Sequence, residues 1–188
     1  MPRTKTIEKA IIYDGDRLPS DERVVAGIRN VHIGISGFYG FERVHMPCVE
    51  DAAFWAPLEK GGLLEEYMPV WVRSKESRDM VLRPSGALAA VRAYVSQKWH
   101  DLPHPLKFSF GGDRFIFKND MIEALPEEGM VMIGEEGPIA EAEMIEIMWK
   151  TLEGLGMDMT RVELRVNATT CAHCRAHYRS GLVCYLRA

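Results

Sequence analysis

The order of the helical and extended segments is the feature that most restricts the fold. Apolar residues recur every three or four positions, as in amphipathic helices, in four segments: 22–35, 86–99, 138–155 and about 172–187. Alternating or apolar runs typical of strands fall between them: 41–47, 68–73, 81–84, 106–110, 115–117, 129–134 and 162–166. Helices and strands therefore do not alternate one for one, which favours an α+β fold with a largely antiparallel sheet over a doubly wound parallel one.

Composition and charge fit a globular chain with a core of its own. The chain has 188 residues, of which 47% are hydrophobic, and a formal charge of −4, which excludes a surface that is basic overall. No apolar run approaches the about 18 residues of a membrane span, and the N-terminus lacks the apolar stretch of a signal peptide. We expect a cytoplasmic protein with reduced cysteines, with residues 1–20 as an N-terminal arm and residues 21–188 as one domain.

Several segments, in this order, resemble the catalytic core of histidyl-tRNA synthetase, a class II aminoacyl-tRNA synthetase. Segment 38–47 (FYGFERVHMP) resembles the first class II motif, segment 48–54 resembles the stretch after it, and segment 82–94 (LRPSGA, then VRAY) resembles LRPEGT and R-A-Y. Segment 102–105 (LPHP) resembles the approach to the second motif, and segment 129–134 (GMVMIG) resembles GxExxG. Segment 138–145 (PIAEAEMI) resembles PxxD/EAEVI, and segment 164–182 (LRVN, CAHCR, YRSGL) resembles LxxN and CxxCRxxYRxxL. Their order and spacing make the resemblance specific.

The resemblance implies a class II synthetase-like fold, with an antiparallel sheet flanked by helices. Class II cores pair through the first-motif helix and strand, so it also implies a homodimer or hetero-oligomer built on residues 22–47. The apolar positions of that helix fit either such an interface or packing within one chain. We expect residues 21–188 to be a truncated core, without the third motif, the histidine-specific arginine segment and the anticodon-binding domain.

The departures from the family pattern fall on its functional residues. The glutamate of LRPEGT, which helps to hold the amino group of the amino acid, is replaced by Ser85, and the glutamate of GxExxG is replaced by Val131. Arg114 matches the arginine of the second motif only if the alignment slips by one residue. The basic loop expected after it is replaced by the acidic segment 121–128.

These losses matter because adenylate formation joins two anions. It needs Mg²⁺ and arginines to neutralise the transferring phosphate, and acids to hold an ammonium group. Of these groups the chain offers at most Arg114 and Arg83. We infer that aminoacylation has been lost; the opposing interpretation is an active core whose motifs are misaligned.

Five residues are candidates for ligand binding. Arg83 and Arg92, nine residues apart, could face one pocket and hold an anion, or form surface ion pairs of little consequence. Ser85, Arg114 and Glu143 occupy positions that the family uses, although Glu143 also fits the charged outer face of a helix. No catalytic residue is predicted.

The CxxC motif of Cys171 and Cys174 is the sharpest chemical signal. Its spacing suits Zn²⁺, but a closed site needs four ligands. Candidates for the other ligands are His173, His177 and Cys184, or groups from another subunit. The alternative is a pair of ordinary thiols near the start of a helix. The cofactor is otherwise unknown, with ATP and Mg²⁺ expected only if the chain is an enzyme.

Two functions remain open from the sequence. The first is a non-catalytic histidyl-tRNA-synthetase paralogue that acts as a regulatory, scaffold or ligand-binding subunit with a protein partner, comparable in kind to the synthetase-like regulatory subunit of ATP phosphoribosyltransferase. The second is a residual ligase that uses ATP and an amino acid, completed by a second chain. The acidic charge makes tRNA an improbable partner under either hypothesis.

Overall fold

A computed structural model describes residues 16–64, 67–75, 77–166 and 172–187. It divides into two compact units, residues 1–157 and 158–188. In the first unit the helices are α1 (Pro19–Phe38), α2 (Ala52–Lys60), α3 (Gly86–Ser96) and α4 (Pro138–Gly154). The strands are β1 (Glu42–Arg43), β2 (Val49–Asp51), β3 (Val70–Arg73), β4 (Asp79–Leu82), β5 (Leu106–Lys118) and β6 (Met121–Ile133). The second unit contains α5 (Ala172–Arg187). The mixed α+β class is confirmed.

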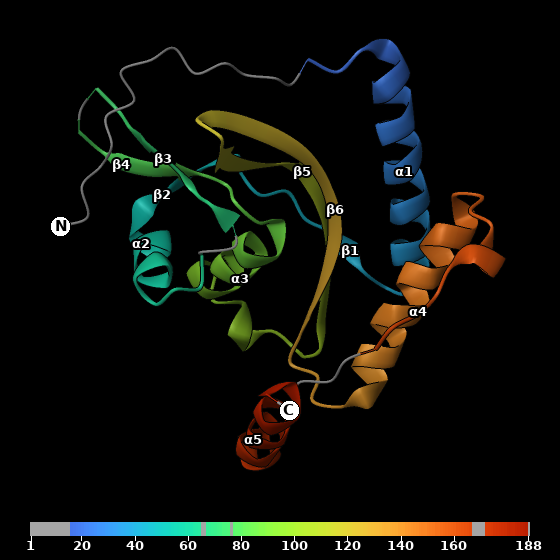
Figure 1. The fold of residues 1–188 in the computed structure, drawn as a ribbon. Coiled ribbons are helices and arrows are strands. Elements are labelled where there is room, and N and C mark those ends of the chain that lie inside the picture. The colour runs from blue at the N-terminus through green and yellow to red at the C-terminus, as the bar shows by residue number, and fades with distance from the viewer. Residues whose placement is uncertain (1–15, 65–66, 76, 167–171, 188) are drawn as a thin grey trace. The chain divides into compact units, whose positions relative to one another are not determined.

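A long hairpin, β5 and β6, organises the first unit (Figure 1). Its thirteen-residue strands pair antiparallel without a bulge, from Leu106 opposite Ile133 to Lys118 opposite Met121. The turn consists of Asn119 and Asp120, which have φ values of 52° and 59°, as a two-residue type I′ turn requires. Segment 121–128, which was expected to be a loop, is therefore the first half of β6.

Two three-stranded sheets meet along the outer edge of β5. One has the order β1-β5-β6, with β1 parallel to β5, and the other is the antiparallel sheet β2-β4-β3. The N–H groups of Phe115 and Phe117 donate to the carbonyls of Arg83 and Met68, which connects the second sheet to the hairpin. The buried core lies between this sheet, α2, α3 and the hairpin, and consists of Met46, Trp55, Leu64, Val81, Ala89, Ala90 and Phe110.

The hairpin has two faces that meet different helices. Side chains alternate between the faces of a strand, so residue contacts assign each face. The α3 face carries Phe110, whose ring lies against Gly86 of α3, and Glu127, which accepts a hydrogen bond from the Gly86 N–H at 2.8 Å. The α1 face carries Asp113 and Glu128, which contact arginines of the α1 region. Figure 1 shows α3 and α1 on opposite sides of the hairpin.

Several predicted elements differ in the structure. The predicted strand 41–47 is reduced to two residues, and α2 was not predicted from its weak pattern. Segment 162–166 is not a strand: it has no regular structure, and Leu164 and Val166 are exposed because nothing in the described chain pairs with it. Residues 1–15 of the predicted N-terminal arm lie outside the described residues. No helix of the described residues is long and apolar enough to cross a membrane.

Candidate functional site

Three of the positions that the family motifs select, Arg83, Ser85 and Arg114, lie in the region of the α3 face of the hairpin. Ser85 caps α3, since its Oγ accepts a hydrogen bond from the Leu88 N–H at 3.4 Å, and it is 3% exposed. The Glu127 carboxylate accepts a hydrogen bond from a second N–H group at this end of the helix, that of Gly86. A helix N-terminus attracts anions because its N–H groups lack partners. Here Ser85 and Glu127 supply acceptors for two of these groups, the N–H groups of Leu88 and Gly86.

Arg83 lies at the junction of the two sheets and is 2% exposed. Its Nη1 donates to the Met46 carbonyl and its Nη2 to the Asp113 carbonyl, both at 2.8 Å. Gly112, with φ of 129°, lies so close that an added Cβ would be 2.7 Å from Nη2. The guanidinium is therefore enclosed by backbone, and the Nε alone is left without a partner in the described structure.

Arg92 does not share a pocket with Arg83. It extends from α3 to the buried carboxylate of Glu50 on β2, with hydrogen bonds of 3.1 and 2.9 Å. The Trp55 indole donates to the same carboxylate at 2.7 Å. Because both oxygens of Glu50 are engaged, the group forms a closed network that joins α2, α3 and β2.

The remaining candidate residues are dispersed. Arg114 lies on the α3 face opposite Leu125, half-buried, and has no hydrogen-bond or ion-pair partner among the described residues. Glu143 of α4 accepts a hydrogen bond from Lys107 of β5, on the α1 face. The five predicted ligand residues therefore do not form one cluster: Arg83, Ser85 and Arg114 belong to the region of the α3 face, and Arg92 and Glu143 face elsewhere. Their role in ligand binding stays a prediction.

The zinc prediction falls largely outside the described residues. Cys171 and the side chain of Cys174 are not described, and His177 and Cys184 are exposed on α5. The described residues contain no group of three or more His, Cys, Asp or Glu side chains that could hold a metal ion.

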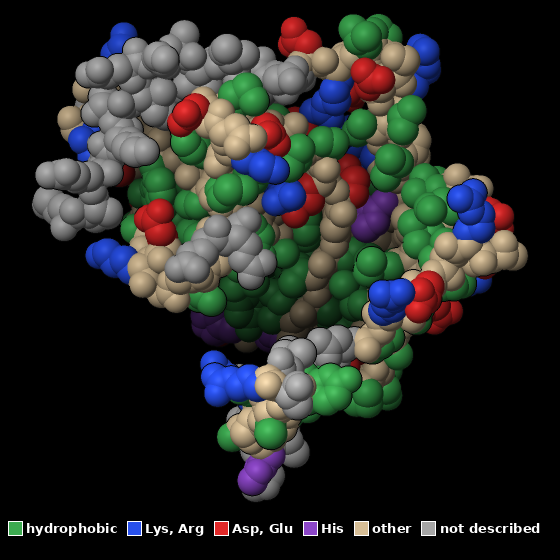
Figure 2. Space-filling model, in the orientation of Figure 1, with side chains coloured by type: hydrophobic (Ala, Val, Ile, Leu, Met, Phe, Trp, Pro, Cys, Tyr) green, Lys and Arg blue, Asp and Glu red, His purple; other side chains and the backbone are tan. Residues whose placement is uncertain are grey.

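Sequence reasoning missed the charge pairing around the hairpin. Arg17 donates twice to the Asp113 carboxylate at 2.7 Å, and Glu128 contacts Arg29 at 2.9 Å and Arg43 at 2.7 Å. Figure 2 shows positive and negative side chains interspersed on the visible face, without a patch of one sign. The partners are about 100 residues apart in the chain, so no local motif could reveal them.

Comparisons with known proteins agree with the motif analysis. No protein-family model matches the chain. The histidine–tRNA ligase of Syntrophotalea carbinolica is 27% identical over 176 residues, or 91% of this chain and 41% of the ligase. That of Aquifex aeolicus is 28% identical over 176 residues, or 91% of this chain and 43% of the ligase. The chain thus spans about two fifths of the length of these relatives.

Solved structures give the same fold. An ATP phosphoribosyltransferase regulatory subunit/histidyl-tRNA synthetase from Bacillus halodurans superposes with a TM-score of 0.65 at 19% identity, over 84% of this chain and 40% of that one. The apo histidyl-tRNA synthetase of S. aureus gives a TM-score of 0.63 at 24% identity, over 76% of this chain and 38% of that one. The chain therefore has the fold of a class II aminoacyl-tRNA synthetase core, and its resemblance to histidyl-tRNA synthetases is confirmed.

Proposed function

We propose that this chain is a non-catalytic histidyl-tRNA-synthetase-like subunit, which acts in the cytoplasm by binding a partner or a ligand. The observation that carries the proposal is the internal neutralisation of its arginines. Arg17 is paired with Asp113, and Arg29 and Arg43 share Glu128. The guanidinium of Arg83 is held by backbone carbonyls.

Internal pairing disfavours nucleotide activation for an energetic reason. A bound ATP phosphate is stabilised most by a guanidinium that is already oriented and free. If the guanidinium must first lose a carboxylate partner, the broken ion pair offsets most of the energy of the new contact. The Glu127 carboxylate also places negative charge at the start of α3, on the α3 face of the hairpin. That carboxylate would repel a second anion at this end of the helix, where the N–H groups of Gly86 and Leu88 already have acceptors.

A regulatory or scaffold role has a precedent in the same fold. The Bacillus halodurans neighbour is described as both an ATP phosphoribosyltransferase regulatory subunit and a histidyl-tRNA synthetase. That description supports the class of function, and the partner of the present chain would be a protein. Because the chain covers only part of its relatives, a second chain could supply further elements.

Self-association through α1 is part of this proposal. Phe38, at the end of α1, is 85% exposed beside a mainly apolar groove of about 510 Å³ between α1 and α4. The groove is lined by Gly34, Ile35, Phe38, Tyr39, Lys150, Glu153 and Gly154. An exposed ring and a groove on one patch suit a two-fold dimer, in which the same surface of each copy faces the other. Residues 22–47 would then provide the interface.

ATP–pyrophosphate exchange tests the non-catalytic role directly. The full chain is incubated with histidine, ATP·Mg²⁺ and labelled pyrophosphate, and calorimetry measures the binding of ATP·Mg²⁺. We expect no exchange above background and no binding heat. An authentic histidyl-tRNA synthetase, assayed in parallel, shows that the conditions support exchange. Exchange catalysed by the wild-type chain, but not by a purified Arg114→Ala variant, would refute the proposal.

The alternative function is a residual ATP-dependent ligase, and one observation favours it. Arg114 lies on the α3 face and has no hydrogen-bond or ion-pair partner within the described part of the chain, so it could meet a phosphate there. The sequence relatives are also histidine–tRNA ligases. Under this alternative, exchange is present and depends on Arg114, and a matched Arg73→Ala variant, at the exposed end of β3, retains it.

A further inference from the structure

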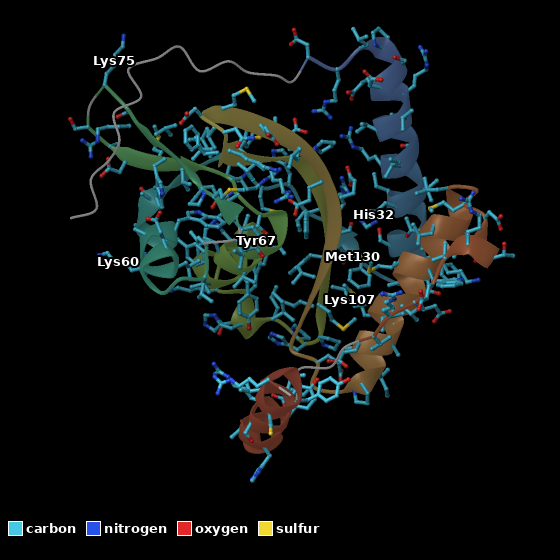
Figure 3. The ribbon with its side chains drawn as sticks, in the orientation of Figure 1. His32, Lys60, Tyr67, Lys75, Lys107 and Met130 are labelled. Carbon is cyan, nitrogen blue, oxygen red and sulfur yellow. The ribbon has the colours of Figure 1, made fainter. Side chains whose placement is uncertain are left out.

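A buried histidine lies in the contact between α1 and the hairpin. His32 of α1 is 4% exposed, and its Nε2 is 3.2 Å from the Gly129 carbonyl of β6. Figure 3 shows His32 between α1 and β6, on the side of the hairpin where Met130 is labelled. In this arrangement Nε2 carries the proton and donates to the carbonyl.

The carboxylate near His32 is already shared by two guanidinium groups. The Glu128 carboxylate, of which 10% is exposed, contacts both Arg29 of α1 and Arg43 of β1. It is therefore not a counter-charge that serves a protonated imidazole alone. Because His32 itself is buried, its protonation in the docked position is opposed mainly by the loss of water around the charge.

Neighbouring elements offer His32 no further carboxylate among the described residues. On α4, Glu143 is paired with Lys107, Glu153 with Lys150, and Glu146 lies beside Tyr39. On β5, Asp113 is paired with Arg17. Burial is the main cause that lowers the pKa of His32 below 6.5, and Arg43 adds to it, whereas Gly129 and Glu128 act in the opposite direction.

We propose that His32 is an acid-sensitive latch, whose protonation releases α1 from the β5–β6 hairpin. The docked state binds a proton less readily than the open state, so docking is fully stable above pH 6.5 and weakens as the pH falls below it. The weakening stops once the pH is below the pKa of the docked state. Helix α1 ends at Phe38, which lines the groove between α1 and α4. Release of α1 in acid would therefore alter that surface. The inference does not depend on whether the chain is catalytic.

Hydrogen exchange of the full chain measures the release directly. Amide exchange of α1 is recorded at pH 7.5 and 5.5 and corrected for the intrinsic chemical rate. With an open-state pKa of about 6.5, the opening equilibrium is expected to rise up to about tenfold over this interval. The amides of α3, on the other side of the hairpin, provide the internal reference and should change less. An equal rise in α1 and α3, or no rise in α1, would overturn the latch.

Two variants test whether His32, and not another histidine, causes the pH dependence of α1 exchange. Gln can donate to the Gly129 carbonyl but does not titrate, so His32→Gln should remove most of the pH dependence of α1 exchange. His45→Gln is the matched control, because His45 is exposed, and it should behave like the wild type. If His32→Gln does not fold, NMR titration of wild-type His32 decides the question. An apparent pKa below 6.5 supports the latch, and one at or above 6.5 contradicts it.

Discussion

Replacing Arg83 with Met tests whether this motif arginine stabilises the fold. The substitution keeps an apolar side chain of similar length and removes the donors to the Met46 and Asp113 carbonyls. Hydrogen bonds from a charged group contribute about 1.5–3 kcal/mol each, so the two account for roughly 3–6 kcal/mol. Removal of the unpartnered Nε offsets about 1–3 kcal/mol of this loss. From the midpoints of these ranges, the expected net loss in the free energy of unfolding is about 2–3 kcal/mol.

Urea denaturation followed by circular dichroism measures this loss, and thermal melting supplements it. For a chain of this size the loss corresponds to a fall in Tm of roughly 4–12 °C. Arg73→Met is the matched control, since Arg73 forms an exposed ion pair with Asp79, and its urea midpoint should equal that of the wild type. If Arg83→Met unfolds at the same urea concentration as Arg73→Met, Arg83 does not hold the sheets together. A role for Arg83 in binding would then regain support.

Further substitutions test other parts of the description. Ser85→Ala removes the cap of α3 and should lower the free energy of unfolding by about 1 kcal/mol in urea titrations. Gly112→Ala places a Cβ against Arg83 at a strained φ and should cost about 1–3 kcal/mol in the same assay; a silent change would contradict the close approach. Glu128→Gln removes the carboxylate that Arg29 and Arg43 share and should cost about 2 kcal/mol in the same urea assay, an effect that high salt reduces only partly. Phe38→Ser should leave the Tm unchanged but weaken self-association in sedimentation velocity, whereas Ile139→Ser, equally exposed at the other end of α4, should not.

The sequence predicts the helices and the class of fold because these depend on local periodicity. The predicted segments 138–155 and 172–187 correspond to α4 and α5 within a few residues. The predicted strand 129–134 is part of β6. The first half of β6 was missed since Glu123, Pro126 and Glu127 resemble loop composition. Pairing with a thirteen-residue partner strand overrides that local preference.

The buried faces of the helices are harder to predict than their positions. The apolar spacing of α1 includes Val24 and Ile28, which fit either an interface between chains or packing within one chain, and these residues are 62% and 39% exposed. The buried positions are instead His32 and Ser36, which are polar. A polar residue can face the core when its hydrogen bonds are satisfied there, as His32 is by the Gly129 carbonyl. Hydrophobic periodicity cannot detect such a face, because its partner lies 97 residues away in the chain.

The candidate site illustrates what a motif match can establish. Arg83 belongs to the segment LRPSGA, which carries much of the resemblance to histidyl-tRNA synthetases. Its guanidinium is enclosed by carbonyls and joins two sheets, so the fold alone gives a physical reason for an arginine at this position. Ser85, two residues further on, satisfies a helix end and needs no ligand to account for its burial. Since these motif positions stabilise the scaffold, their presence is evidence for the fold but not for the reaction. Evidence on the reaction has to come from groups that the scaffold leaves free, and Arg114 on the α3 face, which has no hydrogen-bond or ion-pair partner among the described residues, is a candidate.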